Sequence, residues 1–228
     1  MGGSGPPLLL LHGYPETHLA WAPVAGDLAE DSTVVAPDLR GYGDSTAPPA
    51  TPGHGNAGKR AMARDCVALM GLLGFDRFDV AGHDRGGRVA YRMALDSPAA
   101  VRRLTVLDVV PTGEVWARGD ARFALAYWHG GLLAQPHPLP ERLIAADPEY
   151  FLFDAEFGGA IRGFPPAAVA DYARCARDPA TVEAVCEDYR AGATCDRRDD
   201  DEDRAAGRRI TCPTQDLCAG RGGPSRVT

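Results

Sequence analysis

The stretch FDVAGHDRGGR, residues 78–88, decides the fold. It joins a short apolar run to a helical pattern over Gly86–Leu95 through the sequence Gly-x-Asp-x-Gly. A strand that turns sharply into a helix needs small residues on both sides of the turning residue, and Gly82 and Gly86 occupy those positions. Such a turn projects one side chain, here Asp84, above the end of the sheet. A chance Gly-x-Asp-x-Gly turn is the alternative interpretation.

The rest of the first half repeats this alternation of apolar runs and helical patterns. Short apolar runs suited to buried strands end at turn residues, and residues 59–73 carry an apolar stripe at helical spacing. This order predicts an α/β fold with a mostly parallel sheet and helices on both faces. The predicted strands are Pro7–Leu11, Thr33–Ala36, Phe78–Ala81 and Leu104–Leu107.

The second half has a different character. From Pro111 to about Ala206, strand-like runs give way to helical patterns such as Phe123–Leu133. Arg209–Pro213 then resembles the entry to another strand, which continues imperfectly over Gln215–Gly220. We therefore predict three parts, namely 1–110 as the first part of the core, 111–206 as an inserted helical cap, and 207–228 as the return to the core.

Composition excludes several classes of protein. The 228 residues carry a net charge of −7, so there is no basic excess to neutralise nucleic-acid phosphates. No apolar run approaches the roughly 20 residues of a membrane helix, and we predict a cytoplasmic protein. The six scattered cysteines are expected to be reduced thiols. The charged stretch Arg197–Arg204 is expected to face solvent.

A carboxylate at the nucleophile position restricts the chemistry. It can displace a leaving group from an sp³ carbon or open an epoxide, forming an ester, whereas a serine esterase would need a hydroxyl at residue 84. Arg85 and Arg88 lie one helical turn apart beside Asp84, where two guanidinium groups form a site for a carboxylate. Their field would also keep Asp84 ionised. A surface position is the alternative for Arg88.

Several motifs occur in an order that identifies a family. They are HGYP at 12–15, PDLRGYGDS at 37–45, GHDRGGRVAYRMALDSP at 82–98, VLDVVPTGEVW at 106–116, LAQPHPLPE at 133–141 and CEDYRAGA at 186–193. The set resembles the haloacetate (fluoroacetate) dehalogenases of the α/β-hydrolase superfamily, whose relatives are the epoxide hydrolases and haloalkane dehalogenases. The resemblance implies an α/β-hydrolase fold with a helical cap, and hydrolytic dehalogenation of a short 2-halo acid. It implies no metal or organic cofactor, and it is compatible with a homodimer.

The resemblance also assigns roles to residues of the core. Asp84 would attack the carbon that bears the halogen, and Asp108 would orient the catalytic histidine. The backbone N–H groups of Tyr14 and Arg85 would form the oxyanion hole for ester hydrolysis. The side chains of Arg85 and Arg88 would hold the substrate carboxylate.

Two residues of the cap match the donors that bind the leaving halide in the family, namely His129 and Tyr189. Preorganised donors at the point where charge develops stabilise such a transition state by several kcal/mol. A buried structural histidine or tyrosine is the alternative for each. The family carries a tryptophan, a third halide donor, directly after this histidine, where this chain has Gly130.

The sequence departs from the family at its two ends. The family's base histidine follows one more strand and helix, whereas all six histidines here lie before the final strand: His12, His18, His54, His83, His129 and His137. We therefore expect a fragment without the family's first antiparallel strands and without the base, on which the Asp84 ester stalls because no group activates water. Two other functions stay open, an epoxide hydrolase and a non-catalytic remnant that binds small carboxylates. The arginine pair favours a carboxylate substrate over an uncharged epoxide.

Overall fold

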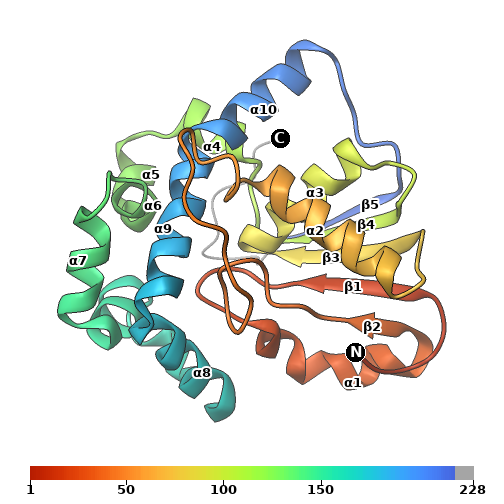
Figure 1. Ribbon diagram of the computed structural model, residues 1–228, viewed down its shortest axis with the longest axis horizontal. Coiled ribbons are helices and arrows are strands. Elements are labelled where there is room, and N and C mark those ends of the chain that lie inside the picture. The colour runs from red at the N-terminus through yellow and green to blue at the C-terminus, as the bar shows by residue number, and fades with distance from the viewer. Residues whose placement is uncertain (219–228) are drawn as a thin grey trace.

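A five-stranded parallel sheet forms the centre of the computed structural model, which describes residues 1–218 (Figure 1). The strand order is β2-β1-β3-β4-β5, and every pairing is parallel, which confirms the predicted sheet. The strands are β1 Pro7–Leu11, β2 Thr33–Val35, β3 Phe78–His83, β4 Val101–Leu107 and β5 Thr214–Leu217. Of the predicted last strand, Ala219 and Gly220 lie outside the described residues.

Helices cover both faces of the sheet because its interior strand β1 is apolar on both sides. Leu10 packs in the cluster on the α1 side, whereas Leu9 and Leu11 pack in the cluster on the side of α2 and α3. Side chains alternate along a strand, so a strand buried on both faces has a continuous apolar sequence. The covering helices are α1 Ala22–Asp31, which follows the short 3-10 helix η1 His18–Trp21, α2 Lys59–Leu72 and α3 Asp84–Asp96.

The strand order reverses beside β1. The chain passes from β1 to β2 on one side, and β3 then pairs with the other side of β1. In open parallel sheets, ligands bind outside the carboxyl ends of the strands where the order reverses. β1 ends at Leu11 and β3 ends at His83. The loop after β1 and the start of α3 therefore meet where a ligand is expected.

Every element between β4 and β5 is helical within residues 1–218. In Figure 1, α5 to α8 lie to one side of the sheet, and α9 runs between them and the core. The elements are α4 Thr112–Arg118, α5 Ala121–Ala126, α6 Trp128–Leu133, α7 Leu139–Ala146, η2 Tyr150–Glu156, η3 Ala160–Gly163, α8 Pro166–Arg177, α9 Pro179–Ala193 and α10 Cys195–Ala205. The division into core and cap at residues 111 and 206 stays a prediction. None of the described helices is long and apolar enough to cross a membrane.

The helical pattern predicted over Phe123–Leu133 is present, but it is interrupted. The chain forms two short helices, α5 and α6, which are separated at Tyr127, whose backbone leaves the helical region (φ −111°, ψ 36°). The ring of Tyr127 packs on Gly130, where an added Cβ atom would overlap the ring carbons. Tyr127 thus fills the space that a side chain at residue 130 would need.

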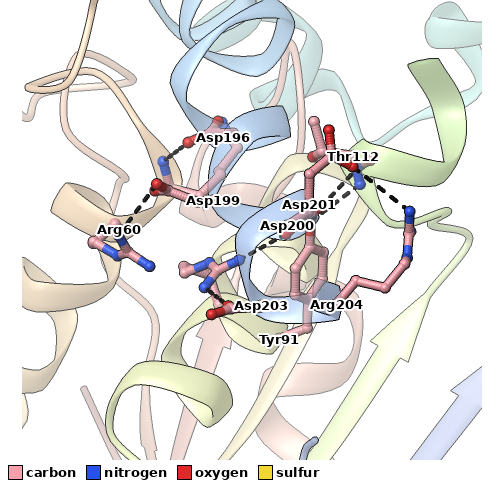
Figure 2. A network of polar contacts seen from close by, with 12 residues as sticks. Arg60, Tyr91, Thr112, Asp196, Asp199, Asp200, Asp201, Asp203 and Arg204 are labelled. Carbon is pink, nitrogen blue, oxygen red and sulfur yellow. Dashed lines mark hydrogen bonds and ion pairs between the residues drawn. The ribbon is translucent and has the colours of Figure 1, made fainter. Parts of the chain in front are cut away.

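The expectation that Arg197–Arg204 faces solvent is wrong for one side of α10. Asp199 and Asp203 of this stretch are buried, as is Asp196 just before it. The physical reason is that basic residues of the core helices lie opposite these carboxylates. Nη1 of Arg60, on α2, forms an ion pair with Oδ1 of Asp199 at 3.2 Å (Figure 2).

A second group of contacts joins α10 to α3 and α4 (Figure 2). Arg92 of α3 donates from Nη2 to Oδ1 of Asp200 at 2.7 Å and also pairs with Asp203. The other carboxylate oxygen of Asp200 accepts hydrogen bonds from the Tyr91 hydroxyl and the Gly113 amide, both at 2.8 Å. This side of α10 therefore anchors the end of the helical segment to the core.

Candidate active site

Asp84 stands at the turn from β3 into α3 with a left-handed backbone (φ 44°). A non-glycine residue in this region stores roughly 1–3 kcal/mol of strain, which its surroundings must hold. They do so by close backbone packing. A Cβ atom at Gly82 would overlap the carbonyl oxygen of Gly86, and one at Gly86 would overlap that of Leu11. The two glycines of the motif are therefore required by the space available.

The loop after β1 brings the backbone of Tyr14 to Asp84. The N–H of Tyr14 donates to Oδ2 of Asp84 at 3.1 Å, where an oxyanion donor is predicted. Glu16 shapes this loop, because its Oε2 accepts from the Gly13 amide at 2.9 Å and lies 3.1 Å from Nδ1 of His83. Burial alone would lower the pKa of His83, but Glu16, aided by Asp84, outweighs burial and raises this pKa to about 8.

Asp108 directly follows β4, at the same edge of the sheet as Asp84. β3 and β4 pair with His83 opposite Leu107, so the residues that follow these two strands are neighbours. Asp108 has a left-handed backbone (φ 47°), and its charge contributes to the raised pKa of His83. The predicted role of Asp108, to orient a base, stays a prediction.

The guanidinium of Arg85 already has a carboxylate partner inside the protein. Its Nε donates to Oδ2 of Asp188 at 2.8 Å, and its Nη2 donates to Oδ1 at 2.6 Å, in bidentate geometry. The guanidinium carbon also lies 4.0 Å from the centroid of the Tyr189 ring, a cation–π distance. Arg85 is therefore neutralised without substrate. Among residues 1–218, only its Nη1 has no hydrogen-bond partner.

Asp188 is the centre of a buried ionic cluster. Besides Arg85, it binds the Tyr42 hydroxyl, which donates to Oδ2 at 2.8 Å, and it forms an ion pair with Lys59. The Asp188 side chain is fully buried. Although burial would raise its pKa, Arg85 and Lys59 hold the pKa of this carboxyl well below its usual range. The cluster joins α9 to α2, to α3 and to the loop after β2.

Arg88 differs from Arg85 in having no carboxylate partner among the described residues. It is 6% exposed, its Nε has no hydrogen-bond partner, and no carboxylate of the described residues forms an ion pair with it. It lies four residues after Asp84 on α3, so both side chains are on the same side of the helix. An unpaired buried charge is costly, and a bound carboxylate would relieve that cost.

The two predicted halide donors lie together beside the loop after β1. The ring centroids of His129 and Tyr189 are 6.1 Å apart, and they lie 6.3 Å and 5.4 Å from the ring of Tyr14. The ring of Tyr127 is 4.3 Å from that of His129, and its buried hydroxyl has no partner within residues 1–218. Burial lowers the pKa of His129 to about 4, against the raising effect of Asp84. The imidazole is therefore neutral near pH 7 and donates from one nitrogen.

Three polar residues at the site, Lys59, Glu156 and Asp188, are missed by sequence reasoning. Asp188 directly precedes Tyr189 in the motif CEDYRAGA, so a signal for it was present. Lys59 begins a predicted helix, and nothing in the sequence indicates its burial, because lysine is almost never fully buried unless paired. Glu156 contacts Tyr14, 142 residues away in the sequence, so no local pattern could have found it.

Comparison with known proteins agrees with this fold. A family model described as alpha/beta hydrolase fold matches residues 6–156. The fluoroacetate dehalogenase of Burkholderia sp is 49% identical over 216 residues, which cover 93% of this chain and 70% of that protein. The soluble epoxide hydrolase of Corynebacterium sp. is 35% identical over 218 residues, which cover 92% of this chain and 73% of that protein.

A solved structure from Nostoc sp PCC 7120, designated an alpha/beta hydrolase, superposes on this one with a TM-score of 0.93 at 48% identity. The match covers 97% of this chain and 76% of that one. The sheet order, the turn at Asp84 and these matches lead to one assignment. The chain belongs to the alpha/beta hydrolase fold family, and it is a hydrolase similar to the fluoroacetate dehalogenase and the epoxide hydrolase.

Proposed function

We propose that this hydrolase removes the halogen from short 2-halo acids through an ester on Asp84. The observation that carries the proposal is a carboxylate at the nucleophile position with the unpaired cation of Arg88 one helical turn later. A carboxylate nucleophile suits attack on an sp³ carbon. An unpaired buried cation suits a substrate with a negative charge of its own. The 49% identity to a fluoroacetate dehalogenase supports the same substrate class.

In the first step, Oδ1 of Asp84 would attack the carbon that bears the halogen, because Oδ2 accepts from the Tyr14 amide. The C–O bond forms as the C–halogen bond breaks, and the halide leaves with the bonding electron pair, so the protein gains and loses no proton. Arg88, with Nη1 of Arg85, would hold the carboxylate and align the carbon. His129 and Tyr189 would donate to the halide as its charge develops.

In the second step, water would cleave the ester and restore Asp84. The Tyr14 amide, 3.1 Å from Oδ2 of Asp84, supports a role in stabilising the negative charge that develops on that oxygen. By the family resemblance, Asp108 would orient a histidine base that activates the water, and none of the six histidines of this sequence occupies the position of that base. Because the first step needs no base, the two steps can be measured separately.

Intact-protein mass spectrometry after incubation with fluoroacetate tests the first step. Fluoroacetate scarcely alkylates thiols, which matters because the protein has six cysteines. The wild type should gain one carboxymethyl group or release fluoride. Asp84→Asn, which keeps the side-chain volume, should do neither. Peptide mapping of the adduct should locate the added group on Asp84.

Either a stable adduct or repeated fluoride release supports the proposal, because both require formation of the ester. Absence of adduct and of fluoride in a folded sample would overturn it. An adduct from an uncharged epoxide would then indicate an epoxide hydrolase, and binding of acetate without any adduct would indicate a carboxylate-binding protein. Arg88→Met separates the two enzymatic activities, because an uncharged epoxide does not need this cation.

A homodimer and a cytoplasmic location are further parts of the proposal. They are supported by the family resemblance and by the composition of the chain. Light scattering of the purified protein tests the dimer, and fractionation of expressing cells tests the location.

A further inference from the structure

Glu156, at the end of η2, is a buried carboxyl group that the proposed mechanism does not use. Its side chain is 1% exposed. Oε2 accepts a hydrogen bond from the Tyr14 hydroxyl at 2.9 Å. Oε1 has no hydrogen-bond partner among residues 1–218 and lies 3.4 Å from Nδ1 of His129. One half of this carboxyl is therefore satisfied, and the other half faces the histidine predicted to bind the leaving halide.

We propose that Glu156 is a positioning residue of the leaving-group site. Its Oε1 hydroxyl donates to Nδ1 of His129 and keeps the imidazole proton on Nε2, from which it is donated to the departing halide. This inference rests on the proposed function, because it requires His129 to bind the leaving group. The separation of 3.4 Å shortens when substrate is bound, as catalytic hydrogen bonds commonly do.

The existing hydrogen bond sets the direction of donation. A neutral carboxyl has one O–H donor and one carbonyl acceptor. Since Oε2 of Glu156 accepts from Tyr14, the proton belongs on Oε1. A neutral imidazole has one N–H and one nitrogen that only accepts. Nδ1 of His129, facing Oε1, is then the accepting nitrogen, and Nε2 carries the proton.

The groups around Glu156 favour its neutral form. Tyr14 faces it from the loop after β1, His129 from α6, Tyr189 from α9, and Asp84 from the start of α3. The carboxylate among them, Asp84, is negative and disfavours a second negative charge. Burial, together with Asp84, raises the pKa of Glu156 to about 8 against the opposing hydrogen bond from Tyr14. Burial lowers the pKa of His129 to about 4, and the cations of α3 add to this effect.

Ionisation of Glu156 reverses the arrangement. A carboxylate only accepts hydrogen bonds, so Nδ1 of His129 has to carry the proton, and Nε2 turns a lone pair toward the halide. Departure of the halide is then opposed instead of assisted. The rate of ester formation in the wild type should therefore fall as the pH rises through about 8.

The test is the single-turnover rate of ester formation from fluoroacetate, followed by intact mass from about pH 6 to 9.5. Glu156→Gln donates an amide N–H to Nδ1 at every pH and still accepts from Tyr14. It should keep most of the rate at pH 7 and lose the alkaline decline. Glu156→Leu lacks the donor and should slow ester formation on the order of ten- to a hundredfold, as loss of a supporting hydrogen bond does.

His83 also titrates with a pKa of about 8 and lies beside Asp84, so Glu156→Gln is the deciding variant. Persistence of the alkaline decline in Glu156→Gln would show that the inference is wrong, and so would a wild-type rate in Glu156→Leu. If Glu156→Leu does not fold, the pH profile of Glu156→Gln still decides. A wild type that forms no ester at any pH would contradict the proposed function instead, so the two failures are distinguishable.

Discussion

Replacement of Asp188 by asparagine should strongly destabilise the protein, because this carboxylate neutralises two buried cations. The side chains of Arg85 and Lys59 are each 2% exposed, and both pair with Asp188. Asparagine keeps the volume and one accepting oxygen but removes the charge. Arg85 then has no carboxylate partner within the described residues, and Lys59 keeps only Asp196, at 3.7 Å.

The expected loss in the free energy of unfolding is about 3–5 kcal/mol, the usual cost of removing one partner from a buried ion pair. This is a large share of a total that is on the order of 5–15 kcal/mol for a folded protein. At about 2–4 °C per kcal/mol for a chain of this size, the melting temperature should fall by roughly 6–20 °C. Adding Lys59→Met should restore part of the loss, because one buried cation fewer is left unpaired.

Urea denaturation followed by circular dichroism measures this loss as a function of pH. Burial alone would raise the pKa of Asp188, but Arg85 and Lys59 hold it below its ordinary value of 3.8. A lowered pKa means that the stabilisation is present above the ordinary value and is lost as the pH falls through the folded-state value. The difference between the wild type and Asp188→Asn should therefore persist down to about pH 4 and shrink only below it.

Asp201→Asn on α10 is the matched control. The Asp201 side chain is 49% exposed, and its pairs with Arg197 and Arg204 measure 3.7 and 3.6 Å. Exposed pairs of this kind contribute little to stability, so Asp201→Asn should unfold at the urea concentration of the wild type. If Asp188→Asn unfolds at that same concentration, the buried cluster does not carry the stability assigned to it, and the reasoning is refuted.

Four further variants test the nucleophile turn, its surroundings and the helix α2. Arg88→Met should slow ester formation from fluoroacetate by roughly ten- to a hundredfold, because a hydrogen bond to a charged group contributes about 1.5–3 kcal/mol; an unchanged single-turnover rate would contradict this. Gly86→Ala should yield little folded protein, because the new Cβ would overlap backbone carbonyls. By contrast, a Cβ added at Gly71 would meet no atom within 4 Å beyond its own helix backbone and chain neighbours, so Gly71→Ala should raise stability by about 0.5–1 kcal/mol in denaturant titrations. The pKa of His83 is about 8, above its ordinary value of 6.5. The stabilisation of the folded state by Glu16 is therefore fully present below pH 6.5 and is lost as the pH rises through about 8. Glu16→Gln should flatten this part of the dependence of the melting temperature on pH, and an unaltered profile would speak against the pair.

Burial explains which elements of the core could be predicted. The bounds predicted for β1, Pro7–Leu11, are confirmed, and α2 ends one residue before the predicted end at Leu73. Both elements bury a regular apolar pattern in the core. α1, by contrast, has no fully buried residue, and it covers the sheet through partly buried residues such as Leu28 and Ala29. This helix was not predicted from the sequence.

Some residues of the candidate site could likewise be predicted from the sequence, and others could not. The proximity of Asp84 and Tyr14 follows from sequence, because both come after strands whose carboxyl ends meet where the strand order reverses. The positions of Glu156 and Asp188 could not be predicted from the sequence, because they depend on how helices that are distant in the sequence pack together. The spacing of apolar residues along a helix or a strand carries no information about that packing. The acidic side of α10 is a related case. Its charged residues were expected to face solvent, but they pair with arginines on α2 and α3.

Asp188 also explains why the two arginines after the nucleophile are not equivalent. Asp188 lies on α9, so Arg85 is neutralised only while α9 packs against α3. Arg88 has no such carboxylate partner within residues 1–218. Arg85 therefore joins the helical segment to the nucleophile turn, and Arg88 is the cation that we propose binds the substrate anion. Their substitutions should differ in kind, since Arg85→Met should lower the urea midpoint, whereas Arg88→Met should leave folding intact and lower the rate of ester formation.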